Sequence, residues 1–185
     1  MQIIVSTSLT PEEYAQGEHP KQVKAPEHCP NCQHLKGLEG LGYYSRGITQ
    51  SKAAVLVILV RRFFCRYCRI TLSCLPAFAQ PYRLVNTKTI EAAFEGRKEG
   101  PEVQRWIRLI DTYWRCFKEH LPELVGRVGN FFGALPLSPG AQGVWEVWIK
   151  RCRSLGALSK ELISRFSTCL FGTYHCHQSK PLHAK

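Results

Sequence analysis

The chain has 185 residues, of which 44% are hydrophobic and 11% aromatic, so the composition excludes a generally disordered protein. A formal net charge of +11 predicts a polyanionic partner, with nucleic acid the first candidate and an acidic membrane surface the second. The longest apolar run, Ala53–Val60, is too short to span a bilayer, so we expect no insertion into a membrane.

The first two predicted parts of the chain are an N-terminal extension and a cysteine-containing region. Residues 1–24 form the extension, in which Thr10, Pro11 and Glu13 indicate a short helix that starts with a capping box. Residues 25–80 carry two Cys-x-x-Cys pairs. Between the pairs lie a glycine-punctuated stretch and a β-branched, aromatic run that is typical of a strand.

The rest of the chain is predicted to be mainly helical. A short helix over 87–95, capped by Thr87, precedes a helix over 101–121 whose apolar residues recur at i, i+3, i+4 and i+7 and which Pro122 ends. Residues 84–123 thereby form a helix-turn-helix-like pair. Residues 124–185 form a C-terminal helical region: a loop over 126–143, helices over 144–155 and 158–170, and a loose tail. The predicted fold class is α+β, a small zinc ribbon followed by a mainly α-helical region.

The two Cys-x-x-Cys pairs predict one structural zinc ion, bound by Cys29, Cys32, Cys65 and Cys68. Each pair places two sulfur atoms one tight turn apart, and four thiolates leave no position open for a catalytic water. Two alternatives remain: four cysteines that only pack, or a dithiol redox site, which usually lies in a βαβ setting. Nine cysteines without a signal-peptide pattern favour metal binding in a reducing cytoplasm over disulfides.

Other potential metal ligands have a more ordinary interpretation. We expect Cys74 to be packed, and His28 and His34 to be surface residues, although either histidine can replace a cysteine ligand. The tail residues 175–177 give a weaker metal signal and are expected to be exposed.

Residues around both cysteine pairs carry a recognisable pattern. It consists of Cys29-Pro30-Asn31-Cys32, the hairpin residues Tyr43, Tyr44 and Arg46, and then Arg61, Arg62, Phe63, Cys65, Cys68, Thr71, Ser73, Leu75, Pro76, Pro81, Tyr82 and Arg83. This pattern resembles the N-terminal zinc ribbon of bacterial insertion-sequence transposases and of short transposase-related proteins of unknown function. The resemblance covers residues 25–95 and implies DNA binding connected with mobile elements.

Two departures limit what the resemblance implies. Arg69 stands where such proteins often have glycine after the last cysteine of the ribbon. No aspartate-rich domain follows, and Asp111 is the single aspartate of the chain, so the strand-transfer activity of transposases is not expected here.

Two groups of basic and polar residues are candidate nucleic-acid contacts. Near the second cysteine pair they are Arg61, Arg62, Arg66, Arg69 and Arg83, and on the helix over 101–121 they are Gln104, Arg105, Arg108 and Arg115. One or two of the first group can serve only to stabilise the cluster of zinc and four thiolates, whose net charge is about −2. The second group can be an ordinary solvated helix face.

The sequence therefore predicts a non-catalytic, zinc-dependent protein that binds double-stranded DNA, as a transposon accessory, a regulator or a truncated transposase. The alternative is a zinc-ribbon subunit of a larger ribonucleoprotein or protein complex, which binds RNA or a protein partner. Exposure of Trp145 and Trp148 would favour that alternative. We expect no enzymatic activity, because the chain has no Gly-rich phosphate loop, Ser-His-Asp set or paired-carboxylate motif.

Overall fold

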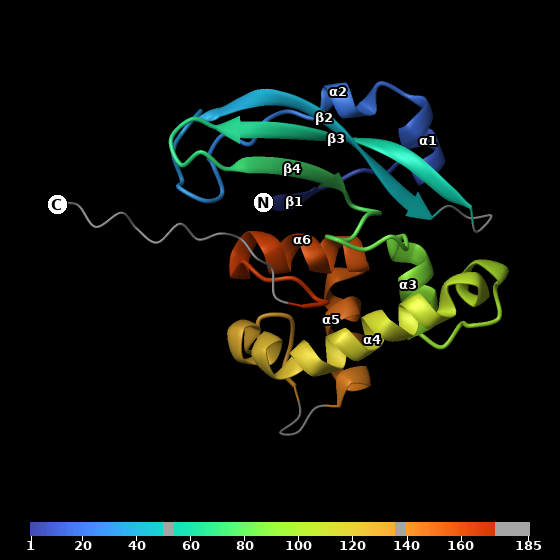
Figure 1. Cartoon of the computed structure of the whole chain (residues 1–185). Coiled ribbons are helices and arrows are strands. Elements are labelled where there is room, and N and C mark those ends of the chain that lie inside the picture. The colour runs from blue at the N-terminus through green and yellow to red at the C-terminus, as the bar shows by residue number, and fades with distance from the viewer. Residues whose placement is uncertain (50–53, 136–139, 173–185) are drawn as a thin grey trace.

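The computed structural model describes residues 1–49, 54–135 and 140–172 and has the expected α+β fold. A four-stranded sheet has the strand order β1-β4-β3-β2, with bounds Gln2–Val5, Thr71–Pro76, Val55–Cys65 and Leu38–Thr49 respectively. β1 is parallel to β4, and the other neighbouring pairs are antiparallel. Figure 1 shows the sheet as an upper layer, with α1 and α2 above it and the remaining helices below it.

The N-terminal residues form an integral part of this sheet. β1 pairs with β4 from Gln2↔Ser73 to Val5↔Pro76, and the Met1 ammonium donates to the carbonyl oxygen of Thr71 at 2.8 Å. After β1, the helix α1 (Pro11–Gln16) starts at the predicted capping box, with Thr10 as the N-cap. The short helix α2 (His19–Gln22) follows. The segment predicted as an extension therefore supplies one edge of the sheet and a cover for it.

The apolar run before the second cysteine pair is the strand β3, as its β-branched content predicts. Its side chains alternate between faces, so Ile58 and Val60 are fully buried while Val57 and Leu59 are exposed. β2 pairs with β3 over its whole length, with a bulge between Gly40 and Gly42. The hairpin therefore has one face in the core, and its open end lies at the cysteines.

The predicted helical pair consists of α3 (Thr87–Phe94) and α4 (Pro101–Val128), which pack against each other. Asn86, and not Thr87, caps α3, and its side chain accepts from the Thr89 amide. The prediction that Pro122 ends α4 is wrong, because the helix continues to Val128. A proline inside a helix costs about 3 kcal/mol, and the burial of Leu121, Leu124 and Val128 on either side of it offsets that cost.

The helices α5 (Ala141–Cys152) and α6 (Leu155–Phe166) correspond to the two further helices predicted, with all four bounds three or four residues earlier in the chain. They enclose one core with α3 and α4, in which Trp145 and Trp148 are 1% and 0% exposed. α4 occupies residues 126–128 of the predicted loop, and residues 136–139 of that loop lie outside the described residues. The burial of both tryptophans removes the exposure that would have favoured a protein-partner role.

Buried polar contacts join the sheet to the helices. The Asn86 side-chain amide donates to the Thr49 carbonyl at 3.0 Å, and the Ser159 hydroxyl on α6 donates to the Gln80 side chain at 2.7 Å. α6 also packs directly on β1. The sheet and the helical layer therefore share one packed structure within the described residues.

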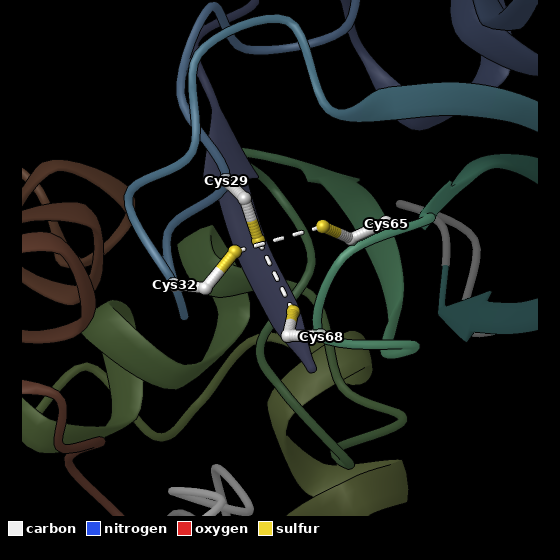
Figure 2. A group of neighbouring side chains, drawn as sticks. All are labelled: Cys29, Cys32, Cys65 and Cys68. Carbon is white, nitrogen blue, oxygen red and sulfur yellow. Dashed lines mark hydrogen bonds between the residues drawn. The ribbon is translucent and has the colours of Figure 1, made fainter. Parts of the chain in front are cut away.

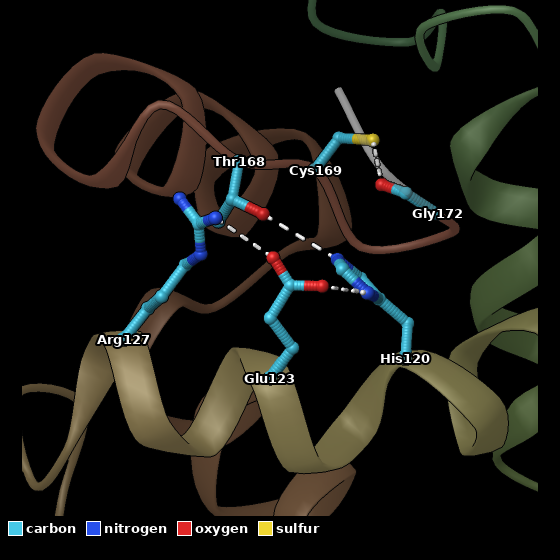
Figure 3. A network of polar contacts seen from close by, with 6 residues as sticks. All are labelled: His120, Glu123, Arg127, Thr168, Cys169 and Gly172. Carbon is cyan, nitrogen blue, oxygen red and sulfur yellow. Dashed lines mark hydrogen bonds and ion pairs between the residues drawn. The ribbon is translucent and has the colours of Figure 1, made fainter. Parts of the chain in front are cut away.

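A second polar network holds the segment after α6 against α4 (Figure 3). The buried His120 has its Nδ1 3.1 Å from Glu123 Oε2 and its Nε2 3.5 Å from the Thr168 hydroxyl, and Arg127 pairs with Glu123 at 2.8 Å. Burial lowers the pKa of His120, and Arg127 lowers it further, against the opposing effect of Glu123. Burial therefore disfavours the charged form of His120 in the folded protein.

Candidate metal centre

The two cysteine pairs form two turns with the same hydrogen-bond pattern. In the first turn, the Cys29 amide donates to the His34 carbonyl at 3.0 Å and the Gln33 amide donates to the Cys29 carbonyl at 2.8 Å. In the second turn the equivalent bonds, Cys65 to Ile70 and Arg69 to Cys65, have the same lengths, 3.0 and 2.8 Å. We call these turns the first knuckle (residues 29–34) and the second knuckle (residues 65–70).

The knuckles bring four sulfur atoms to one point, as Figure 2 shows. The Sγ atoms of Cys29, Cys32, Cys65 and Cys68 all lie within 4.8 Å of one another. Two of the distances between knuckles are 3.6 Å, for Cys29 and Cys68, and 3.7 Å, for Cys32 and Cys65. A tetrahedron with metal–sulfur bonds of about 2.3 Å has sulfur–sulfur edges of roughly 3.8 Å. The donor set therefore fits a tetrahedral metal ion, and these four cysteines can bind one.

Backbone amides point at the sulfur atoms and favour their ionised form. Burial raises the pKa of Cys29 to about 12, against hydrogen bonds from the Cys32 and Asn31 amides that lower it. Burial also opposes ionisation of Cys68, but hydrogen bonds from the Asn31 side chain, the Ile70 amide and the Cys65 and Cys32 side chains together outweigh it and bring the pKa to about 7. Amide donors of this kind stabilise thiolates, which are the metal-binding form of cysteine.

The remaining cysteines of the described segments do not share this arrangement. Cys74 is fully buried, as predicted, and Cys116, Cys152 and Cys169 lie elsewhere in the fold and form no disulfide within the described residues. Cys176 and its flanking histidines lie outside the described residues. His28 and His34 are exposed, as expected of surface residues.

Two of the predicted arginines lie on the second knuckle itself. Arg66 is exposed and forms an ion pair with Glu39 on β2. Arg69 is exposed and takes part in no ion pair within the described residues. Its φ of 59° is left-handed, a conformation that glycine adopts without strain, and Gln33 has the same φ at the equivalent position of the first knuckle. This conformation explains why a glycine suits position 69.

The other three predicted arginines of this group make protein contacts. The Arg61 guanidinium lies 4.7 Å from the centre of the Tyr43 ring, and that of Arg62 lies 6.0 Å from the centre of the Tyr44 ring. Arg83 donates to the Phe171 carbonyl and lies 5.2 Å from the Tyr113 ring centre, so it ties the chain after β4 to the helical layer. Arg83 therefore has a structural role in addition to any contact with a ligand.

The predicted contacts on α4 form a separate surface. Arg105, Arg108 and Arg115 are exposed on this helix, and the Gln104 side chain donates to the Lys98 carbonyl at 2.6 Å. In Figure 1, α4 begins at the right of the view, whereas β3 reaches the knuckles at the left. The second knuckle and the start of α4 therefore lie at opposite sides of this view.

Residues 29–113 match the model of a domain of unknown function, DUF6431. No curated protein and no solved structure matches the chain. The matched segment starts at Cys29, includes both knuckles and reaches Tyr113 within α4. The cysteine cluster, α3 and the first part of α4 thus fall within one matched unit. Among the described residues, no helix combines the length and the apolar character that a membrane span requires.

Three features near the site did not follow from the sequence patterns. The His34 and Tyr67 rings, one from each knuckle, stack with their centres 3.3 Å apart. Arg46 donates to the Gln80 and Arg83 carbonyls and so fixes the turn between β4 and α3. Tyr82 in that turn has a φ of 58°. The Pro81-Tyr82 pair is the one available signal for the third feature, because proline sets up a turn whose next residue can require positive φ.

Proposed function

We propose that the protein is a non-catalytic, zinc-dependent DNA-binding protein related to transposases, in which a zinc ribbon presents arginines to DNA phosphates. The observation that carries this proposal is the second knuckle, in which two of the four convergent cysteine sulfur atoms, those of Cys65 and Cys68, belong to the same turn as the exposed Arg69. The net charge of +11 supports a polyanionic partner.

Zinc is the metal whose preferences best match the site. Tetrahedral coordination by four thiolates is typical of structural zinc, and such a site keeps no position for a reacting water. Cys29 and Cys32 would hold the ion from the first knuckle, and Cys65 and Cys68 from the second. The bound ion would supply no reaction, and its contribution would be the free energy that holds the two knuckles together.

The exposure of Arg69 favours a role in binding over a purely structural one. Glu39 partly neutralises Arg66, which leaves Arg69 as the knuckle arginine without an acidic partner in the described structure. A guanidinium in this position is suited to a bidentate phosphate contact.

The test measures metal content and salt-dependent DNA binding on the same purified protein. We expect one zinc per chain, and an affinity for duplex DNA whose logarithm falls linearly with the logarithm of salt concentration, by about 0.9 for each phosphate neutralised. Replacing Arg66 and Arg69 by alanine should weaken binding and reduce that slope by about 2. The matched control replaces Lys150 and Arg151, two exposed basic residues of α5, and should leave the slope almost unchanged.

Other results would contradict the metal assignment or the DNA-binding proposal. Clearly less than one zinc in a folded sample would refute the metal assignment. If the knuckle and α5 substitutions weakened DNA binding equally, binding would depend on the overall positive charge of the protein and not on a defined surface. Tighter binding of structured RNA, or no binding of any nucleic acid, would favour a subunit of a ribonucleoprotein or protein complex. Replacing Arg105 and Arg108 tests the α4 surface in the same assay.

A further inference from the structure

A shallow groove lies between the β2 strand and the turn that follows β4. It has a volume of about 300 Å³ and is lined by Gln2, Tyr44, Arg46, Gly47, Tyr82, Arg83 and Leu84. This volume is at the small end of the range of roughly 300–1,000 Å³ for small-molecule sites. Two tyrosines and two arginines in such a small space are suited to a planar ring that carries or adjoins negative charge.

The turn that contains Tyr82 is fixed by hydrogen bonds to its backbone. The Arg83 amide donates to the Gln80 carbonyl at 3.1 Å, and Pro81 precedes Tyr82, whose φ is 58°. These features define a type II turn, in which the position of Tyr82 strongly favours glycine. The Arg46 guanidinium donates to both the Gln80 and the Arg83 carbonyls. The turn is therefore fixed at both ends, and the strained residue is its most exposed side chain.

The Tyr82 side chain is 60% exposed, so burial of its ring does not repay the backbone strain. A tyrosine at a glycine position, exposed and beside a groove, is the kind of outlier that indicates a function. Tyr82 and Tyr44 both line the groove, so their rings offer aromatic surface to a ligand there.

Arg62 lies beside the groove residue Tyr44, in the direction of the second knuckle. Tyr44 and Arg62 lie on the same face of the β2–β3 hairpin, because Gly42 pairs with Arg62 and Tyr44 with Val60. The Arg62 guanidinium lies 6.0 Å from the centre of the Tyr44 ring. Arg62 is three residues before Cys65, the first ligand of the second knuckle. A nucleic-acid strand that contacts the knuckle through its phosphates would thus have the groove within reach.

We propose that this groove binds one unpaired nucleobase of the DNA, stacked on Tyr82 and Tyr44, while the arginines contact the adjoining phosphates. The proposal rests on the proposed DNA-binding function and sharpens it: the preferred ligand is a duplex that ends in, or contains, a single-stranded segment. Stacking on aromatic side chains tolerates any base, so the groove selects an unpaired base without reading sequence.

The experiment compares a blunt duplex with the same duplex carrying a single-stranded extension, at the 3′ end or the 5′ end. The extension contains 2-aminopurine, whose fluorescence falls when it stacks on an aromatic ring. We expect the zinc-loaded protein to bind one of the extended duplexes more tightly than the blunt one, by about 5- to 100-fold. The fluorescence of the extension should be quenched in that complex.

Three substitutions of Tyr82 separate stacking from structure. Tyr82→Phe keeps the ring and should keep both the preference and the quenching, whereas Tyr82→Leu should lose both. Tyr82→Gly should also lose both, while its melting temperature stays equal to or above that of the wild type because the strain is relieved. A residue with a merely structural role would lower the melting temperature when truncated to glycine.

The experiment separates failure of the groove proposal from failure of the proposed DNA-binding function. If the wild type binds blunt and extended duplexes equally, or if Tyr82→Leu keeps the preference, the groove proposal is wrong and DNA binding stands. If no DNA is bound even at low salt, the proposed function fails and this proposal fails with it.

Discussion

The left-handed residues of the two knuckles allow a prediction in which stability and binding change in opposite directions. Arg69→Gly removes a backbone conformation that costs an L-residue about 1–2 kcal/mol, and the greater freedom of glycine in the unfolded chain returns about 0.5–1 kcal/mol of that. The Arg69 side chain is exposed, so little packing is lost. We therefore expect a net gain of about 0.5–1 kcal/mol in the free energy of unfolding, or a rise of about 1–4 °C in melting temperature.

Gln33→Gly is the matched control, because Gln33 has the same φ of 59° and its amide makes the equivalent hydrogen bond. Both variants should gain stability by a similar amount in thermal unfolding of the zinc-loaded protein. Only Arg69→Gly should weaken DNA binding, and its plot of log affinity against log salt should become shallower by about 0.9, the value for one phosphate contact.

Two results would refute this reasoning. A fall in melting temperature for Arg69→Gly alone would mean that the guanidinium stabilises the negatively charged thiolate cluster by more than the backbone strain costs. An equal loss of DNA affinity in the two glycine variants would mean that knuckle rigidity, and not the charge of Arg69, controls binding.

Three other predictions concern the metal, the His120 network and the packing of α6. Cys65→Ser should reduce bound zinc to well below one per chain and lower the melting temperature, whereas Cys116→Ser should keep full metal content. Burial lowers the pKa of His120 below its ordinary value of 6.5, so the unfolded chain takes up a proton more readily. Stability should then fall as pH drops below about 6.5, and His120→Gln should flatten that dependence in urea titrations at several pH values. Gly156→Ala should lower stability by about 1–3 kcal/mol, because the added methyl group would overlap the Ala77 carbonyl; a gain, as helix propensity alone predicts, would contradict the packing.

The cysteine cluster was predictable because a Cys-x-x-Cys turn is a local structure. Its geometry depends on a few neighbouring residues, and the strand-like composition of residues 55–65 indicated how the second pair is reached. The regular apolar spacing of α4 likewise identified that helix before its contacts were known.

The features that escaped prediction depend on contacts between distant parts of the chain. β1 has only four residues, and its partner strand begins almost seventy residues later, so its place in the sheet has no local signal. Pro122 is a helix-ending residue by local rules, and only the buried residues around it keep α4 continuous. The groove beside Tyr82 also requires Gln2, Tyr44 and Leu84 to be brought together by the fold.

Cys65 is both the last residue of β3 and a member of the cysteine cluster, and it pairs with Leu38 at the open end of the hairpin. If β3 slipped by one residue against its neighbours, every side chain of the strand would move to the opposite face, including this sulfur atom. The two sulfur atoms of the first knuckle would then lack their partners. A metal ion bound at the cluster would therefore stabilise only one pairing of the two long strands. During folding, its binding would favour the correct strand register over a shifted one.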